Sequence, residues 1–258
     1  MPQNIPNFQI IGAAKAATTT LAGMLSQHPQ AGIVAGKEPH FFSMDEQYRK
    51  GWPWYQQGFD HCRGKLMVGD ASTSYSRIRY HPNTVKRILH HVPEVKIIYM
   101  VRHPLDRIES AYIERLGSVD ALHAYPSINL AVKAEPMMID SSRYWEVFDH
   151  YRQFMDEDRI RIVWFEEFIE NKLAIFHDIC RFLDIDDEVV IQANESHQNS
   201  REQVLNRIDR MFCEDRPSIN TSWDPQVRSW VLSQIKDDNS RLLDYFGKPA
   251  DYWGNLSG

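Results

Sequence analysis

Apolar residues occur along the chain in two alternating patterns, short runs and helical spacings. The runs are typical of buried strands, and they cover residues 8–11, 31–35, 66–70, 95–101 and 159–165. Apolar residues three or four apart, typical of helices, start at residue 18 and recur over 81–91, 143–155, 173–183 and 225–246. Strands that alternate with helices predict an α/β fold with a mostly parallel central sheet flanked by helices.

Two stretches are weakly patterned. Residues 116–142 contain Gly117, Pro126 and Pro136, and we expect a connection there, such as a substrate-side loop or lid. Residues 192–222 are polar and irregular, apart from a helix predicted near Val204–Phe212. No internal repeat, low-complexity tract or linker stands out, so the sequence predicts one domain over residues 1–258.

Composition and charge narrow the class of protein. Hydrophobic residues make up 43% of the chain and charged residues 25%, as in a soluble globular protein. The net charge of −6 argues against a nucleic-acid partner or an anionic membrane surface. Residues 77–107 nevertheless hold seven Lys/Arg against two acids, whereas residues 135–195 hold sixteen acids against six Lys/Arg. An anionic ligand is expected at the basic segment.

The cysteines and the N-terminus bear on location. Cys62, Cys180 and Cys213 have no metal-type spacing, and they fit free thiols in a reducing compartment. No signal peptide is visible, and the strongest apolar run, residues 95–101, is too short to span a bilayer. We therefore expect a cytoplasmic protein with no membrane span and no metal; the sequence carries no signal for an oligomeric state.

The first strand, its loop and the helix that follows predict an anion site. The loop after Gly12 is made of small residues and one lysine, and its candidate ligand-binding positions are Lys15, Ala16, Ala17, Thr18, Thr19 and Thr20. Small residues let the backbone approach a ligand, and the amides at a helix start attract phosphate or sulfate. A nucleoside-triphosphate loop has its lysine directly before the hydroxyl residue, and this one does not. An ordinary strand–loop–helix corner is the alternative.

Further candidate residues follow other predicted strands. Pro39 forbids a regular helix over residues 37–42, so a shaped loop there places Glu38 and His40 near the anion site. Glu38 alone is as readily half of a solvated pair with Lys37, and His40 either assists at an acceptor or packs. The aromatic residues of 48–55 form either core or a platform for a sugar.

The strand over residues 95–101 leads into Arg102, and Ser110 lies about two turns into the next helix. Both side chains could reach one anion; the alternative is a surface arginine and an ordinary helix serine. The anion loop, Asp70 and Arg102 all follow strands, so we expect them together at the carboxyl edge of a parallel sheet.

These motifs resemble the sulfotransferases that use 3′-phosphoadenosine-5′-phosphosulfate (PAPS). Residues 15–21, Lys-Ala-Ala-Thr-Thr-Thr-Leu, are similar to that family's 5′-phosphosulfate loop, commonly K-x-G-T-T-x-L. Residues 97–112 resemble its 3′-phosphate motif, with matching Arg102 and Ser110. Residues 37–42 and 51–55 look most like the heparan sulfate and related carbohydrate branch. The resemblance runs from about Phe8 to Leu183 and implies a P-loop-like phosphosulfate cradle.

The resemblance implies transfer of a sulfuryl group from PAPS to a hydroxyl or amine of a small-molecule or glycan acceptor. A carbohydrate is the first choice of acceptor. The second product would be 3′,5′-ADP. It further implies that Glu38 is the catalytic base and that Lys15 neutralises charge on the departing phosphate. Thr18–Thr20 would hold the 5′-phosphate, and Arg102 with Ser110 the 3′-phosphate.

Two positions depart from the family pattern. Ala17 stands where glycine is usual, and we predict that its backbone is right-handed, so that the missing glycine does no harm. Asp70 stands where some carbohydrate members carry lysine.

Two other functions stay open. One is a P-loop kinase with Asp70 as a magnesium ligand, which strict magnesium dependence would favour. The other is a non-catalytic binder of nucleotide or sulfated glycan, which would bind 3′,5′-ADP without transferring sulfate.

Overall fold

The computed structural model describes most of the chain. The described residues are 5–36, 38–115, 125–191 and 220–254. The chain separates into two compact units, of which the first is Met1–Arg102 with Val147–Asn194 and the second His103–Glu146 with Glu195–Gly258. Among the described residues, the first unit holds the β-sheet and the second is helical.

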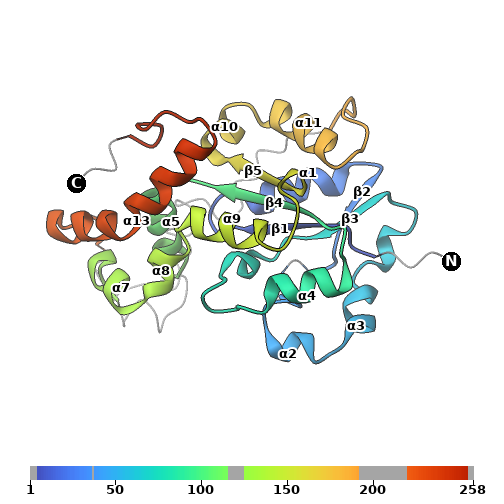
Figure 1. The fold of residues 1–258 in the computed structure, drawn as a ribbon, viewed down its shortest axis with the longest axis horizontal. Helices are drawn as coiled ribbons and strands as arrows, with labels where there is room; N and C mark the ends of the chain where they lie inside the picture. Colours follow the sequence, from blue (N-terminus) through green and yellow to red (C-terminus); the bar gives the residue numbers. More distant parts are fainter. Residues whose placement is uncertain (1–4, 37, 116–124, 192–219, 255–258) are drawn as a thin grey trace, which may run out of the picture. The chain divides into compact units, whose positions relative to one another are not determined.

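A five-stranded parallel sheet forms the centre of the first unit, in the order β2-β3-β1-β4-β5 (Figure 1). The strands are β1 (Phe8–Gly12), β2 (Ala31–Ile33), β3 (Met67–Asp70), β4 (Lys96–Val101) and β5 (Ile160–Trp164). Every residue of the central strand β1 is buried, and Ile10 pairs with Ile98 of β4. Burial on both faces explains the continuous apolar runs in the sequence. The predicted α/β class with a parallel sheet is confirmed.

Helices of the first unit pack against the sheet at several strands. They are α1 (Thr18–Gln27), α2 (Asp45–Tyr48), α3 (Trp52–Gln57), α4 (Thr84–His91), α10 (Phe165–Glu170) and α11 (Lys172–Phe182), with short 3₁₀ turns η1 (Asp60–Cys62), η2 (Thr73–Ser76) and η3 (Glu157–Arg159). Helix α1 contacts β1 and β2, and α10 and α11 contact β5. Leu21 and Leu25 of α1 are fully buried, which accounts for the helical spacing of its apolar residues.

The second unit contains α5 (Pro104–Arg115), α7 (Ile128–Ala134), α8 (Pro136–Asp140) and α13 (Pro225–Tyr245). Helix α9 (Tyr144–Arg152) crosses the boundary between the units. Within the second unit, Asp238 of α13 accepts hydrogen bonds from the backbone amides of Trp145 (3.0 Å) and Glu146 (2.9 Å). This carboxylate satisfies two amides at the start of α9 that have no partner inside the helix.

Several boundaries differ from the sequence prediction. The helix expected over 81–91 begins at Thr84, and the short helices α2, α3 and α10 were not predicted. Residues 116–142, expected to lack regular structure, contain α7 and α8. Ser127 starts α7 by accepting from the amide of Asn129, and Pro136 starts α8 from the first helical turn, where proline is tolerated. The helix predicted near 204–212 lies outside the described residues.

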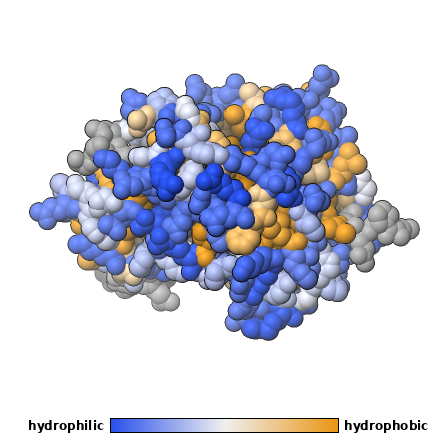
Figure 2. Space-filling view, viewed as in Figure 1, coloured by the Kyte–Doolittle hydropathy of each residue, from blue (hydrophilic) through white to orange (hydrophobic). Residues whose placement is uncertain are grey.

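The surface is largely polar on the face in Figure 2, where hydrophobic residues gather in smaller areas. None of the helices in the described residues is both long enough and apolar enough to cross a bilayer. Within the same residues, no three His, Cys, Asp or Glu side chains come together as metal ligands would.

Candidate active site

The loop between β1 and α1 contains residues with positive φ angles. Gly12 has φ 142°, and a Cβ there would lie 2.4 Å from Ser76 Oγ, so only glycine lets these two segments approach. Lys15 follows with φ 74°. The Ala13 amide donates to Met100 O (2.6 Å), which ties the loop to β4. Thr18 is buried, whereas Thr19 is exposed at the start of α1.

The prediction of a right-handed backbone at Ala17 is wrong. Ala17 has φ 65° and ψ 23°, a left-handed conformation, and it is the N-cap of α1. The chain needs this turn because α1 starts immediately after it, and the alanine side chain supplies no cap for the first amides. An alanine in this region costs about 1–2 kcal/mol relative to a right-handed residue.

Arg102 lies against the same loop. Its Nη1 donates to Lys15 O (3.0 Å), and its guanidinium lies 4.3 Å from the centre of the Phe165 ring. The expectation that the loop and Arg102 share the carboxyl edge of the sheet is therefore confirmed. Ser110 lies on α5 of the second unit, and its pairing with Arg102 stays a prediction.

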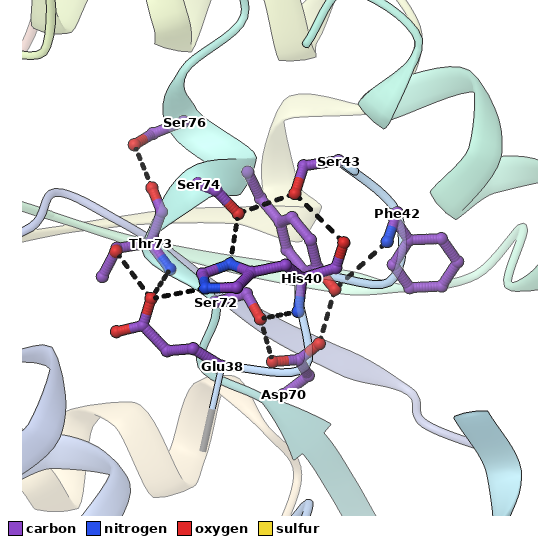
Figure 3. A network of polar contacts seen from close by, with 10 residues as sticks. Glu38, His40, Phe42, Ser43, Asp70, Ser72, Thr73, Ser74 and Ser76 are labelled. Carbon is purple, nitrogen blue, oxygen red and sulfur yellow. Dashed lines mark hydrogen bonds and ion pairs between the residues drawn. The ribbon is translucent and has the colours of Figure 1, made fainter. Parts of the chain in front are cut away.

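Glu38 and His40 lie in a loop held by residues after β3 (Figure 3). The Glu38 Oε2 atom accepts from Thr73 Oγ1 (2.9 Å) and from the Thr73 amide (3.3 Å). His40 Nε2 lies 3.7 Å from the same oxygen, and both side chains are 26% exposed. Lys37, the partner in the solvated-pair alternative, lies outside the described residues. The buried Thr73 thus fixes the Glu38 carboxylate, which stays partly accessible.

The tautomer of His40 follows if the three polar contacts around it are all formed as hydrogen bonds. Ser43 Oγ donates its proton to His40 O (3.2 Å), so it must accept from Ser74 Oγ, 2.7 Å away. Ser74 has then used its own proton and must accept from His40 Nδ1, at 2.7 Å. Nδ1 therefore carries a proton, and in the neutral ring Nε2 is the basic nitrogen that faces Glu38.

Asp70 is fully buried beneath this loop. It accepts from Ser72 Oγ (2.8 Å), Tyr55 OH (2.9 Å) and Tyr75 OH (2.6 Å). Burial raises the pKa of Asp70 to about 6, and hydrogen bonds from Tyr75, Ser72 and Tyr55 partly oppose the rise. Three hydroxyl donors already occupy its two oxygens, so Asp70 does not fit the magnesium-ligand role of the kinase alternative.

Of the aromatic residues of 48–55, Tyr55 belongs to the buried core, whereas Tyr48, Trp52 and Trp54 are half-buried. Tyr55 is buried and stacks on Phe41 with ring centres 4.5 Å apart. Trp52 stacks on His91 at 4.4 Å, yet Trp52 and Trp54 keep part of their surface exposed. The core alternative is thus confirmed for Tyr55, whereas a platform for a sugar at Trp52 and Trp54 stays a prediction.

The hydroxyl side chains that organise the site were not predicted from the sequence. Ser72, Thr73, Ser74 and Tyr75 each bond to a group of the loop over residues 38–43. Ser76 donates to Thr73 O (3.0 Å) and lies against Gly12. A run of hydroxyl residues directly after a buried strand was the available signal. This run, residues 72–76, joins the anion loop to the Glu38 loop.

Comparisons with known proteins agree on one family. The family model described as "Sulfotransferase domain" matches residues 6–237. Over 114 residues the chain is 33% identical to human "Heparan sulfate glucosamine 3-O-sulfotransferase 5", covering 44% of this chain and 32% of that protein. It is 32% identical over 111 residues to "Membrane-associated sulfotransferase kil1" of Dictyostelium discoideum, covering 42% and 22%. The matches thus span a fifth to a third of these relatives.

Solved structures match over nearly the whole chain. A sulfotransferase from Alicyclobacillus acidocaldarius has a TM-score of 0.73 and 25% identity, covering 96% of this chain and 98% of that one. The sulfotransferase domain from the curacin biosynthetic pathway has a TM-score of 0.57 at 14% identity, covering 96% and 99%, which shows a shared fold.

Proposed function

The chain belongs to the sulfotransferase domain family, and from this membership we propose that it transfers a sulfuryl group from PAPS to an acceptor. The acceptor atom is a hydroxyl or amine, and a carbohydrate is the first choice. The products are the sulfated acceptor and 3′,5′-ADP. The names of the relatives support this choice, since one of them acts on heparan sulfate glucosamine.

The donor's 5′-phosphosulfate binds at the turn between β1 and α1. The turn fits an anion because α1 begins here without a side-chain cap, and the N-terminus of a helix attracts negative charge. Lys15 and the hydroxyls of Thr18–Thr20 add donors. Lys15 also offsets the charge that grows on the phosphate as the sulfuryl group leaves. Arg102 and Ser110 bind the 3′-phosphate, which selects PAPS over ordinary nucleotides.

Glu38 removes the acceptor's proton as the acceptor oxygen or nitrogen attacks sulfur. The two bonds from Thr73 fix the carboxylate in one orientation, which a general base requires. His40 Nε2 lies beside the carboxylate and is basic in the neutral ring, so it provides a second place for the proton. A protonated His40 would then form an ion pair with Glu38.

The observation that carries the proposal is the connection between the two loops. Ser76 packs on Gly12 at the start of the anion loop, and Thr73, three residues earlier, holds Glu38. A short segment after β3 therefore sets the general base at a fixed place relative to the phosphate loop. This arrangement suits in-line transfer, in which acceptor and donor must be aligned.

An acceptor screen tests the proposal. Purified protein is incubated with ³⁵S-labelled PAPS and a panel of unsulfated glycans, phenols and lipid alcohols, with and without EDTA. We expect label in at least one glycan, formation of 3′,5′-ADP, and no effect of EDTA. Replacement of Lys15 by alanine should weaken both donor binding and turnover.

Two outcomes would contradict the proposal. Tight binding of 3′,5′-ADP with no labelled product from any acceptor class would indicate a non-catalytic binder. Loss of all activity in EDTA, with recovery on adding magnesium, would favour a kinase-like mechanism.

Within residues 48–55, Trp52 and Trp54 stay partly exposed, and we propose that their rings contact a sugar.

A further inference from the structure

We propose that Asp70 is a positioning residue, which holds the Glu38 loop in its working conformation through the hydroxyls of Ser72 and Tyr75. The proposal deepens the function above and rests on it where catalysis is concerned. Asp70 itself is buried and touches no part of the accessible surface. It acts through two hydroxyls, that of Ser72, which lies between the carboxylate and the loop in Figure 3, and that of Tyr75.

Each hydroxyl makes two bonds, one to Asp70 and one to the backbone of the loop. Ser72 Oγ donates to Asp70 Oδ1 (2.8 Å) and accepts from the His40 amide (3.1 Å). Tyr75 OH donates to Asp70 Oδ2 (2.6 Å) and accepts from the Phe42 amide (3.4 Å). Two amides on either side of Phe41 are thus both linked to one carboxylate.

The charge of Asp70 determines the direction of both links. An ionised carboxylate only accepts hydrogen bonds, so the Ser72 and Tyr75 protons must point toward Asp70. The oxygen lone pairs then face outward, where they can accept from the His40 and Phe42 amides. Because the raised pKa of Asp70 is still about 6, the carboxylate is mainly ionised at neutral pH.

The loop needs such support because its backbone is strained. Glu38 has φ 66° and His40 has φ 53°, and neither is glycine. Residues in this region cost roughly 1–3 kcal/mol each and persist only where surrounding contacts enforce them. The bonds from Ser72 and Tyr75 lie at and just beyond the second strained residue. Without them, the loop would relax and Glu38 would leave the place set by Thr73.

Tyr55 offers a matched control. Its hydroxyl donates to the same Asp70 oxygen as Tyr75 (2.9 Å), but it accepts from Gln9 Nε2 of β1 (3.5 Å) and not from the loop. Tyr55→Phe therefore removes one hydrogen bond from Asp70 and no bond to the loop. Tyr75→Phe and Ser72→Ala each remove a bond of the same kind that does reach the loop.

The experiment compares Ser72→Ala, Tyr75→Phe, Asp70→Asn and Tyr55→Phe in two measurements. Hydrogen exchange of the His40 and Phe42 amides, followed without substrate, should quicken by about tenfold or more in the first three variants only. The kcat for sulfuryl transfer should fall roughly 10–100-fold in those variants, the scale of a misplaced catalytic group. The affinity for 3′,5′-ADP should stay within about twofold of wild type in all four.

Equal exchange and equal kcat in Tyr55→Phe and Tyr75→Phe would overturn the proposal, because Asp70 would then be merely a buried structural group. If the Asp70→Asn variant fails to fold, the Ser72→Ala and Tyr75→Phe variants still test the proposal. If wild type transfers no sulfuryl group, the proposed function fails, yet the exchange measurement still decides whether Asp70 holds the loop.

Discussion

Left-handed backbone angles cluster at the candidate site. Four of the five described non-glycine residues with positive φ lie in its two loops, and the fifth is Asp184. The four are Lys15, Ala17, Glu38 and His40. Such angles are costly for residues with a Cβ, and they are found where function requires a particular shape. At this site they turn the anion loop into α1 and present the Glu38 carboxylate.

Ala17 allows this cost to be measured. Replacing Ala17 by glycine should stabilise the protein, because glycine adopts a left-handed backbone without a Cβ clash. Relief of strain outweighs the added freedom of the unfolded chain, and we expect a gain of about 1 kcal/mol. Thermal unfolding should then shift upward by roughly 2–4 °C.

Ala16→Gly is the control, since Ala16 is buried and is not among the positive-φ residues. Glycine there should lower the unfolding temperature, because it removes a buried methyl group and adds freedom to the unfolded chain. If Ala17→Gly also lowers the temperature, the left-handed N-cap at Ala17 is contradicted.

Glu38 carries the sharpest functional prediction. Glu38→Gln keeps the size of the side chain and can still accept from Thr73, but it cannot take a proton. Transfer should fall by roughly 10²–10⁴-fold, the usual contribution of a general base. Affinity for 3′,5′-ADP should hardly change, since other residues hold the nucleotide. The measurements are kcat with the best acceptor and calorimetric affinity for 3′,5′-ADP.

The control for Glu38 is Glu46→Gln on α2, which removes an exposed carboxylate from the same part of the chain. It should retain full activity. A Glu38→Gln enzyme with more than about a tenth of wild-type kcat would show that another group takes the proton. His40, whose Nε2 faces Glu38, would be the next residue to test.

At the scale of elements, the sequence predicted what is local. The strand–loop–helix of β1 and α1 and the strand before Arg102 could be placed because apolar periodicity and small residues act within one stretch of chain. The hydroxyl run after β3 could not be assigned, because its partners lie about thirty residues earlier and only folding brings them together. Left-handed Ala17 was missed because propensity favours the opposite angle.

The end of β4 carries the prediction about donor recognition. If Arg102 binds a 3′-phosphate while contacting Lys15 O, Arg102→Ala should weaken the binding of 3′,5′-ADP far more than the binding of 5′-AMP. For wild type, 3′,5′-ADP should raise the melting temperature well above the shift given by 5′-AMP, because a tighter ligand stabilises the native state more. Thermal shift assays with both nucleotides measure this. Equal shifts in wild type would remove the main support for PAPS as donor.

At the scale of the molecule, the open question is whether the two compact units unfold as one domain. The family model matches residues 6–237 and so spans both, and α9 crosses the boundary between them. Helix formation is cooperative, so loss of one end of α9 weakens the other. We therefore predict a single unfolding transition, as expected of the single domain read from the sequence.

Two acids, the fully buried Asp70 in the first unit and the half-buried Asp238 in the second, make this testable through pH. Burial raises the pKa of Asp70 to about 6, against its hydrogen bonds from Tyr75, Ser72 and Tyr55. Burial likewise raises the pKa of Asp238 to about 6, against backbone bonds from Glu146 and Trp145. The pKa of each carboxyl group is thus higher in the folded protein than its ordinary value of 3.8. The folded state therefore binds this proton more tightly than the unfolded state does. The contribution of these two acids to the free energy of unfolding should therefore fall as pH rises from about 4 to about 6 and level off above that.

Asp70→Asn and Asp238→Asn each remove one titrating group, so each should flatten this fall over the same pH range. Calorimetric scans at several pH values between about 4 and about 7 would measure it for wild type, both variants and the double variant. If the chain unfolds as one domain, both substitutions shift the same single transition, and their effects on the slope add because the residues seen to bond to Asp70 and to Asp238 are different. Two transitions, one moved only by Asp70→Asn and the other only by Asp238→Asn, would show instead that the units unfold independently. A slope unchanged in both variants would contradict the raised pKa values themselves.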